Sequence, residues 1–287
     1  MTLSDQQSLE NFIAQALQED VGQGDHTSLS TIPAAQQGKA QLIIKEDGVL
    51  AGLEVGRAVF QAVDASLNVE LLSEDGDLVK DQDVVLRVSG RIHSILKAER
   101  LVLNIMQRMS GIATVTHQVV QALNGTDCQV LDTRKTTPGL RFLEKAAVKI
   151  GGGVNHRFGL YDMILIKDNH VDYAGGIAAA LEAAYTYRAG LSQPIPIEIE
   201  VRNMEELEAV LAFGKVDRIL LDNFNPESLK LAVDRVDGRF ITEASGGITL
   251  ENAGAFARSG VDFISMGALT HSVKSLDMSL KAEKIAL

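Results

Sequence analysis

The chain has 287 residues, of which 46% are hydrophobic and 23% charged, and its formal net charge is −11. This is the composition of a folded globular protein, and the length allows one barrel or two domains. A chain this acidic lacks the basic face that a phosphate backbone demands, which excludes nucleic acid as a general partner.

The sequence also argues against a membrane or secreted protein. No apolar run approaches the roughly 20 residues that span a bilayer, and the start, MTLSDQQSLENF, lacks the basic-then-apolar pattern of a secretory signal. Cys128 is the only cysteine, which excludes an internal disulfide and a multi-cysteine metal site, and we expect it to pack in the core. We therefore expect a soluble, cytoplasmic protein that binds no membrane.

The first third of the chain predicts an α+β arrangement. Apolar residues between 9 and 17 recur with the spacing of one buried helix face. AQLIIKEDGVLAG predicts a strand with a turn at Asp47-Gly48, a helix follows near residues 54–63, and NVELLS and DVVLRVSG predict short strands. A long helical stretch, HSILKAERLVLNIMQRMS, leads out of this region.

After Gly111, β-like runs alternate with helical segments. The six runs are CQVLDT, DMILIK, IEIEVR, RILLDN, FITEAS and FISMGA. This alternation predicts a parallel sheet with crossover helices, either open and doubly wound or closed toward a β/α barrel. No GxGxxG follows the first run, which weighs against a dinucleotide-binding fold.

The residues that follow the six strands favour the barrel. In chain order they are Arg134-Lys135, Lys167-Asp168, Glu200, Asp222-Asn223, Ser245-Gly246-Gly247 and Gly267. Active sites of β/α barrels form at this edge from groups on several strands. Each position also has a purely structural alternative: Glu200 could alternate with Glu198 on an exposed edge strand, Asp222 could cap a helix, and the glycines could form a plain turn.

Basic residues are concentrated in one segment of this acidic chain. Between Asp132 and His170 there are seven Lys and Arg against four Asp and Glu, a local charge of +3, which leaves −14 elsewhere. Such an island suits a small anion. Lys145 and Lys149 lie four apart on a predicted helix and are expected to be solvated. Three glycines precede Asn155-His156-Arg157, which indicates backbone close to a ligand and argues against a core position for His156.

The strand-end groups indicate the chemistry of the ligands. Fixed cations suit a carboxylate-rich or phosphorylated molecule, which Arg can bind bidentately. Glu200 and Asp222, one β/α unit apart, suit Mg²⁺. Glycine turns after the last two strands suit a phosphate bound by backbone N–H groups. Together they predict a site for a polyanion and a phosphorylated, metal-bound partner.

Several blocks of the sequence resemble a known family. DTRKTTPGLR, GGGVNHRFGLYDMILIKDNH, EIEV, LLDNF, SGGI and GVDFISMGALT are similar to the motifs of the quinolinate phosphoribosyltransferases, the carboxylating nicotinate-nucleotide pyrophosphorylases of de novo NAD synthesis. KEDGVLAG and AERLVLNIMQRMSGIAT in the first third agree, so the resemblance covers nearly the whole chain.

The resemblance implies a fold and a reaction. The fold would be α/β, with an N-terminal α/β sandwich (1–111) joined by the C-terminal tail (270–287) and an incomplete β/α barrel of about six β units (112–269). The enzyme would join quinolinate to 5-phosphoribosyl 1-diphosphate with Mg²⁺, giving nicotinate mononucleotide, pyrophosphate and CO₂. A homodimer or a dimer-built assembly is expected.

The resemblance also implies the roles of particular residues. Those around the dicarboxylate would be Arg100, Arg134, His156, Arg157 and Lys167, with Lys135 beside the shared pocket. Thr133 would also bind substrate, and Lys45 would enter from the partner subunit. Glu200 and Asp222 would hold the ribose hydroxyls and Mg²⁺. The 5-phosphate would be bound by Ser245, Gly246, Gly247, Met266, Gly267 and Ala268. Lys135, Lys167, Glu200 and Asp222 would be the catalytic residues.

Three alternatives remain at this point. A related phosphoribosyltransferase-like paralogue, associated with molybdenum transport, shares the implied fold. A non-catalytic phosphosugar or dicarboxylate binder would not need Glu200 and Asp222. An aldolase could use Lys167 as a Schiff base, but such a lysine usually requires a desolvated site and not several neighbouring cations.

Overall fold

The computed structural model describes residues 3–283, with side chains from residue 6 onward, and the chain forms two compact units. Unit 1 combines the chain up to Val115 with Thr137–Gly151 and the chain from Ser272 onward, whereas unit 2 comprises Thr116–Thr136 and Gly152–His271. The division therefore differs from the expected boundary at residues 111 and 112, because it falls four residues later, inside a helix. It also assigns Thr137–Gly151 to unit 1 and not to the barrel.

Unit 1 is built from helices and antiparallel strands. Its helices are α1 (Leu3–Val21), α2 (His26–Thr31), α3 (Leu53–Val63), the first part of α4 (Ile92–Ala122) and α5 (Arg141–Ile150). Its strands are β1 (Gln37–Ile44), β2 (Gly48–Val49), β3 (Asn68–Leu71), β4 (Leu78–Val79), β5 (Val84–Arg91) and β12 (Met278–Ala282).

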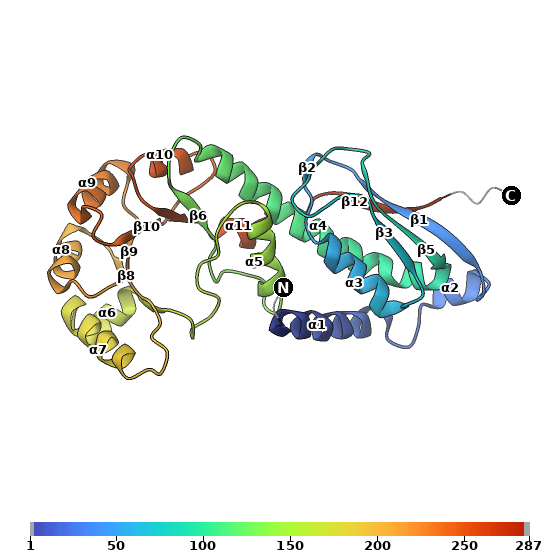
Figure 1. Ribbon diagram of the computed structural model, residues 1–287, viewed down its shortest axis with the longest axis horizontal. Coiled ribbons are helices and arrows are strands. Elements are labelled where there is room, and N and C mark those ends of the chain that lie inside the picture. The colour runs from blue at the N-terminus through green and yellow to red at the C-terminus, as the bar shows by residue number, and fades with distance from the viewer. Residues whose placement is uncertain (1–2, 284–287) are drawn as a thin grey trace. The chain divides into compact units, whose positions relative to one another are not determined.

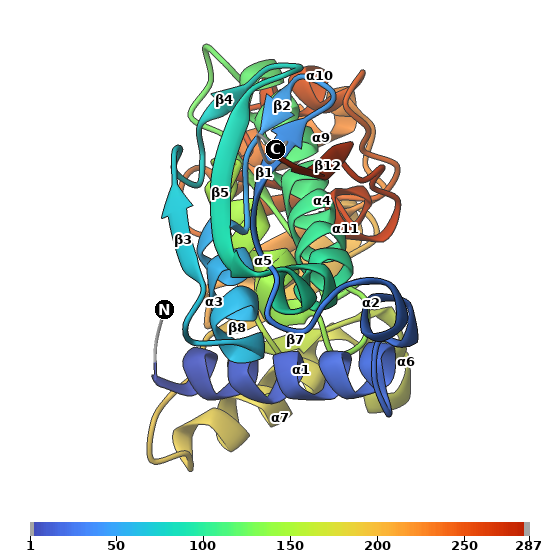
Figure 2. The same ribbon diagram turned by 90° about the vertical axis from the view of Figure 1, so that its right-hand side faces the viewer.

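The main sheet of unit 1 has the strand order β12-β1-β5-β3, and β2 pairs with β4. All neighbours are antiparallel, and β1 and β5 run side by side through the sheet (Figure 2). Strand β12 pairs with β1, with Ala282 opposite Ala40, so the described part of the tail belongs to this sheet. The largest fully buried side chains here include Phe60, Leu42 and Ile44.

Helix α5 explains why Thr137–Gly151 belongs to unit 1. Phe142 meets Phe12 of α1 edge to face at 6.0 Å between ring centroids. Arg108 of α4 donates from Nε to Glu144 Oε1 at 2.8 Å, and the Thr137 backbone N–H donates to Oε2 at 3.1 Å. These contacts bury one side of the helix, and Lys145 is only 2% exposed. The expectation that Lys145 is solvated is therefore wrong, whereas Lys149 is exposed as expected.

Replacing Arg108 by methionine is expected to lower the free energy of unfolding by about 3–5 kcal/mol, because it leaves the buried Glu144 carboxylate without its cation. Urea unfolding measures this change. The control is Arg87→Met, which removes a half-exposed guanidinium with ion pairs of 3.6 and 3.9 Å and should cost less than about 1 kcal/mol. Equal small losses in both variants would contradict the assigned role of Arg108.

Unit 2 alternates strands and helices. Its strands are β6 (Gln129–Leu131), β7 (Ile164–Ile166), β8 (Ile197–Val201), β9 (Arg218–Asp222), β10 (Ile241–Ser245) and β11 (Phe263–Ser265). Its helices are α6 (Asp168–Ala174), α7 (Ile177–Ala189), α8 (Met204–Phe213), α9 (Pro226–Val236), α10 (Ala253–Ala257) and α11 (Ala268–His271).

The six strands form one parallel sheet in the order β6-β11-β10-β9-β8-β7, which confirms the six predicted β units. Helices α7, α8, α9 and α10 lie along the outside of the curved sheet (Figure 1). Strands β6 and β7 end the sheet without pairing with each other in the described chain, so the barrel is incomplete. Strand β8 pairs on both sides and is buried throughout, which rules out an exposed edge strand for Glu200.

Two smaller expectations also concern this part of the chain. Cys128 is buried, and burial raises the pKa of its thiol to about 12, so it is a packed core residue as predicted. No helix in residues 3–283 combines the length and the apolar character needed to cross a membrane.

Candidate active site

The carboxyl ends of the unit 2 strands surround a cavity of about 780 Å³. It contains fourteen of the sixteen residues that the sequence assigned to the site: Thr133, Arg134, Lys135, His156, Arg157, Lys167, Glu200, Asp222, Ser245, Gly246, Gly247, Met266, Gly267 and Ala268. They come from all six strand ends and from the loop before β7. Parallel strands bring their carboxyl ends to one edge, so residues far apart in sequence meet there.

The other two predicted residues, Arg100 and Lys45, belong to unit 1. Arg100 lines a separate cavity of about 370 Å³ within that unit, together with Phe12 and Leu101. Lys45 Nζ lies 3.5 Å from Gln82 Oε1. Neither residue lines the cavity at the strand ends of unit 2.

The basic part of the cavity includes two neighbouring guanidinium groups. Burial, and then the charge of Arg134, lower the pKa of Arg157. Arg157 Nη1 donates to the Met163 carbonyl at 3.2 Å, which fixes the side chain on the cavity wall. Lys135 is fixed through its own carbonyl, which accepts from Thr270 Oγ1 at 2.8 Å. Cations held this close favour an anion between them.

The acidic part of the cavity consists of Glu200, from β8, and Asp222, from β9. Burial raises the pKa of Glu200, and the Lys167 ammonium lies 3.4 Å from Glu200 Oε2. Asp222 accepts from Ser245 Oγ and from Asn223 Nδ2, both at 2.6 Å. These carboxylates have fixed orientations and face the same cavity as the cations. Their oxygens are ligands of the kind that Mg²⁺ prefers, with waters and phosphate oxygens as further ligands.

The turn after β10 requires a glycine. Gly246 has φ +90°, and a Cβ there would overlap Asn223 Oδ1 and lie 2.9 Å from the Asn223 backbone nitrogen. Asn223 itself has φ +57° and orients Asp222. Close packing of this turn therefore supports the carboxylate at the end of the neighbouring strand.

Replacing Gly246 by alanine is expected to lower kcat/KM for the phosphorylated substrate by about 100-fold, because the Cβ displaces Asn223 and with it Asp222. Gly238→Ala is the matched control, since Gly238 does not line the cavity, no described atom lies within 4 Å of its Cβ, and its φ of +65° costs stability but little activity. Steady-state kinetics on both variants measure the difference. Equal activity losses would contradict the role assigned to the Gly246 turn.

The three glycines before Asn155 have a different role from the one expected. Gly151 follows the last residue of α5, where its N–H bonds to the Ala147 carbonyl, and Gly152 has φ +91°. None of the three lines the cavity. They end the helix and turn the chain, and the buried Asp132 then holds the loop by accepting from the His156 backbone N–H at 2.8 Å.

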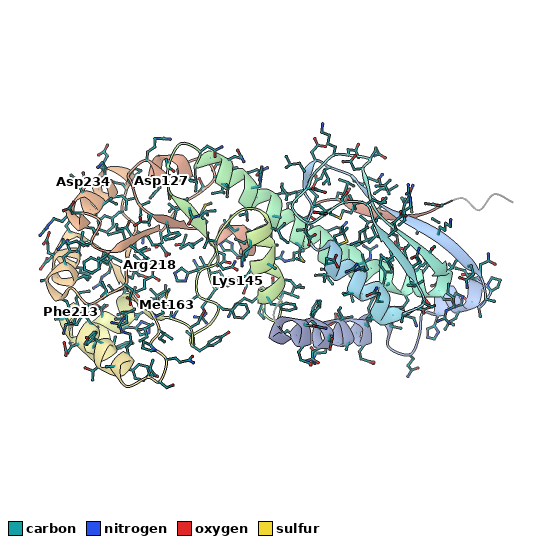
Figure 3. The ribbon with its side chains drawn as sticks, viewed as in Figure 1. Asp127, Lys145, Met163, Phe213, Arg218 and Asp234 are labelled. Carbon is teal, nitrogen blue, oxygen red and sulfur yellow. The ribbon has the colours of Figure 1, made fainter. Side chains whose placement is uncertain are left out.

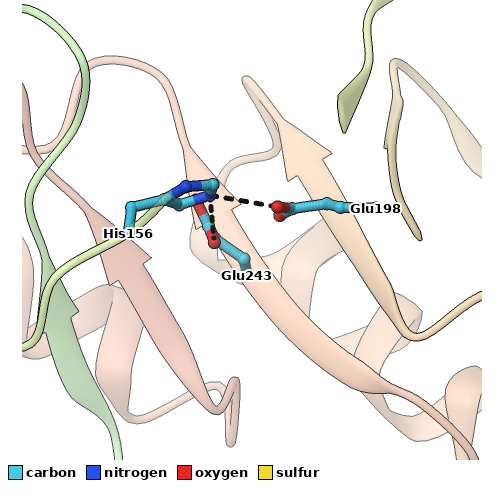
Figure 4. Close-up of side chains that lie close together, drawn as sticks. All are labelled: His156, Glu198 and Glu243. Atoms are coloured by element: carbon cyan, nitrogen blue, oxygen red, sulfur yellow. Dashed lines mark ion pairs between the residues drawn. The ribbon is translucent and has the colours of Figure 1, made fainter. Parts of the chain in front are cut away.

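His156 occupies a more buried position than its sequence context suggests. Its side chain is 7% exposed, and Nε2 lies 3.0 Å from Glu198 Oε2 and 3.3 Å from Glu243 Oε2 (Figure 4). Arg218 Nη1 lies 2.9 Å from the same Glu243 oxygen. As a whole residue His156 is half-buried and also lines the cavity, so it is not confined to the core. We call His156, Glu198, Glu243 and Arg218 the buried cluster.

The protonation of the buried cluster follows from its contacts. Burial lowers the pKa of His156, but hydrogen bonds to Glu198 and Glu243 outweigh it and raise the pKa to about 9. The Arg157 backbone N–H, however, donates to Nδ1 at 2.7 Å and requires a lone pair there. Burial also raises the pKa of Glu198, to about 7. A proton shared between Nε2 and Glu198 fits these contacts, and it leaves Nδ1 as the acceptor.

Glu243 and Arg218 lie in no motif that marks them as site residues, and Glu198 stands in the sequence only as a neighbour of Glu200. A signal was present, because Glu198 and Glu200 alternate on a strand that is otherwise apolar, so both point to the same face. His156, Glu198 and Glu243 also place three ligand-type atoms within 4.8 Å of one another, which is geometrically sufficient for a cation. Arg218 neutralises one of these two carboxylates, and His156 Nε2 already lies against both.

Comparison with known proteins decides the family. The model of the quinolinate phosphoribosyl transferase N-terminal domain matches residues 25–110, and that of the C-terminal domain matches residues 112–281. The chain belongs to the quinolinate phosphoribosyltransferase family. This confirms the resemblance seen in the sequence motifs.

Individual members of the family are similar over nearly the whole chain. A chloroplastic carboxylating nicotinate-nucleotide pyrophosphorylase of Arabidopsis thaliana is 46% identical over 290 residues, covering 96% of this chain and 83% of the relative. A mitochondrial decarboxylating quinolinate phosphoribosyltransferase of Nicotiana tabacum is 44% identical, covering 96% and 82%. The crystal structure of NadC from Streptococcus pyogenes superposes with a TM-score of 0.91 at 38% identity, covering 96% and 98%.

Membership of this family favours a phosphoribosyltransferase over a non-catalytic binder, and the geometry at Lys167 argues against an aldolase. The predicted α/β fold and the class of enzyme, a phosphoribosyltransferase of de novo NAD biosynthesis, are both confirmed. Lys167 Nζ lies 3.4 Å from Glu200 Oε2 and its side chain is half exposed, whereas a Schiff-base lysine usually requires a desolvated site.

Proposed function

We propose that the cavity at the strand ends of unit 2 is where this enzyme joins quinolinate to 5-phosphoribosyl 1-diphosphate, giving nicotinate mononucleotide, pyrophosphate and CO₂. The proposal rests mainly on the residues that line one cavity. Its wall carries four basic residues and two acidic ones: Arg134, Lys135, Arg157, Lys167, Glu200 and Asp222. Quinolinate is a dianion and the other substrate is a phosphorylated sugar, so a site for both needs fixed cations and oxygen ligands together.

The proposed arrangement assigns a task to each wall. Arg134 and Arg157 bind the two carboxylates of quinolinate, with Lys167 beside them. Glu200 and Asp222 bind the ribose hydroxyls. The turns at Gly246-Gly247 and Gly267-Ala268 border the cavity and bind the 5-phosphate through backbone N–H groups.

The chemistry follows from charge placement. As the bond from ribose C1 to pyrophosphate breaks, its electron pair leaves with pyrophosphate, and Glu200 and Asp222 stabilise the positive charge on the sugar. The quinolinate nitrogen forms the new bond to C1. Lys135 faces the leaving group. Holding both substrates in line supplies about 7–11 kcal/mol of the barrier reduction, and no covalent nucleophile is needed.

Decarboxylation then uses the positive charge of the new pyridinium ring. The bond from C2 to its carboxylate breaks, the electron pair stays at C2 beside the quaternised nitrogen, and C2 takes up a proton. Mg²⁺, which we propose as the metal, would be held by Glu200 and Asp222 and would neutralise charge on the pyrophosphate.

One assay tests the proposed function. The protein is incubated with quinolinate, phosphoribosyl diphosphate and Mg²⁺, and nicotinate mononucleotide and CO₂ are measured. We expect stoichiometric formation of both. Absence of product, or product formed from nicotinate in place of quinolinate, would refute the proposal.

A homodimer is part of the proposal. Arg100 and Lys45 belong to unit 1, and resemblance to the family supports Lys45 as a residue that completes the cavity of the partner subunit. Light scattering during gel filtration is expected to give twice the mass of the 30.9 kDa chain. The proposed location is the cytoplasm, supported by the single cysteine, and microscopy of a fluorescent fusion tests it.

A further inference from the structure

The buried cluster is unusual for the interior of a β/α barrel, which is commonly filled by branched apolar side chains. Glu198 is fully buried on β8, two residues before Glu200 and on the same face, so it lies one layer deeper in the barrel. It pairs in register with Arg218 on β9, and Glu243 on β10 is also fully buried. Arg218 lies inside the curve of the strands, whereas Asp234 lies on the outer helix α9 (Figure 3).

Such a cluster is not explained by stability. Buried ion pairs cost desolvation, and well-packed apolar residues of similar size are often as stable. Both Glu198 oxygens lack a hydrogen bond within the described chain apart from the ion pair with His156. The main contact of Glu198 is therefore the imidazole. His156 and Glu243 both line the cavity, and the imidazole accepts from the Arg157 backbone N–H.

That connection runs through the backbone. His156 Nδ1 accepts from the Arg157 backbone N–H, and Arg157 Nη1 then reaches the Met163 carbonyl. The two carboxylates hold the other ring nitrogen, at 3.0 and 3.3 Å. Because both ring nitrogens are engaged, rotation of the imidazole would break contacts on both sides at once.

We propose that Glu198 and Glu243 are positioning residues: they fix the imidazole of His156, which in turn fixes the turn at Arg157 and aims its guanidinium into the cavity. Arg218 balances the charge of Glu243. The inference rests on the proposed function, because it assigns these buried acids to quinolinate binding. They do not attract the substrate, since two carboxylates beneath a site for a dianion repel it.

This repulsion makes the proposal testable. If Glu198 acts by holding His156, removing its charge while keeping an acceptor should leave KM for quinolinate unchanged. If only its charge matters, the same change should lower that KM. Glu198→Gln removes the negative charge but keeps an oxygen that accepts from Nε2, whereas Glu198→Leu removes the acceptor. We expect the Gln variant to keep the wild-type KM for quinolinate within about threefold and the Leu variant to raise it by about 10- to 100-fold. KM for phosphoribosyl diphosphate should stay within about threefold in both.

Glu243 is tested without leaving a buried cation unpaired. Glu243→Leu is combined with Arg218→Met, and the same selective rise in KM for quinolinate is expected. A fall in KM for quinolinate in Glu198→Gln would show that only charge matters and would overturn the proposal. An equal rise for both substrates in the Leu variants would also overturn it, because that indicates general loosening.

Two further measurements keep the test decisive. Calorimetry of quinolinate binding without the second substrate separates this proposal from the proposed function, because it needs no turnover. Wild type that binds quinolinate but makes no product would refute the reaction alone. The metal content of purified wild type and of Glu198→Gln is also measured, and we expect no difference between them. A stoichiometric metal that is present in wild type and lost in Glu198→Gln would overturn the positioning role. If Glu198→Leu does not fold, the direction of change in Glu198→Gln still decides between position and charge.

Discussion

Replacing Asp222 by asparagine is expected to lower kcat by about 10²- to 10³-fold, the usual effect of removing a fixed group aimed at charge that develops in the transition state. Asp222 accepts from Ser245 and Asn223, so its orientation is set before substrate binds. Asparagine would turn an amide N–H₂ toward one of these donors and would remove the negative charge. KM for quinolinate should change by less than about threefold, because that substrate lies on the basic wall.

The measurement is steady-state kinetics with each substrate varied in turn, repeated over a range of Mg²⁺ concentrations. Glu200→Gln should behave similarly, and half-saturation by Mg²⁺ should move to higher concentration in both variants. Asp234→Asn is the matched control, since its exposed carboxylate on α9 pairs only with Lys230 in the described contacts. A kcat for Asp222→Asn close to that of wild type would refute its catalytic role.

Replacing Arg157 by alanine is expected to raise KM for quinolinate by about 30-fold or more, because truncating one member of a buried, hydrogen-bonded charge pair costs about 2–5 kcal/mol. The lowered pKa of Arg157 still belongs to a guanidinium, so the residue stays charged near neutral pH and the effect should not vary between pH 6 and 8. KM for phosphoribosyl diphosphate should change little.

Arg157→Lys gives an intermediate result if geometry as well as charge is needed. Lysine keeps the cation but loses the planar fork that binds a carboxylate and the Met163 carbonyl together. Arg235→Ala is the control, because this exposed guanidinium pairs with Glu208 away from the cavity. An unchanged KM for quinolinate in Arg157→Ala would refute its place on the substrate wall.

The fold of unit 2 was predictable because its signals are local. Each β-like run is short, apolar and followed by a helical pattern, and both faces of the central strands β8 and β9 are largely buried in the sheet. The register of a parallel sheet then brings all the carboxyl ends to one edge. For that reason the residues after each strand, such as Lys167, Glu200 and Asp222, could be assigned to one site before any contact was known.

The exposure of Lys145 and the role of the three glycines could not be predicted from the sequence, because they depend on residues that are distant in the chain. Lys145 has the spacing of a solvated helix residue, yet α5 packs in unit 1, where Phe142 meets Phe12 and Glu144 meets Arg108. The helix pattern states which residues share a face but not which element will cover that face. The three glycines likewise predict unusual backbone, but helix termination and ligand contact leave the same pattern in the sequence.

The sequence by itself determined the alternating architecture, the family and the charged residues at the strand ends, since these follow from periodicity and from motifs that are continuous in the chain. Only the tertiary structure decided how His156 is held. Glu198 and Glu243 are 42 and 87 residues away from it, and each would be read alone as an ordinary acidic residue. Their role exists only where the curved sheet brings Glu198, Glu243 and Arg218 beside His156, because buried charges require partners.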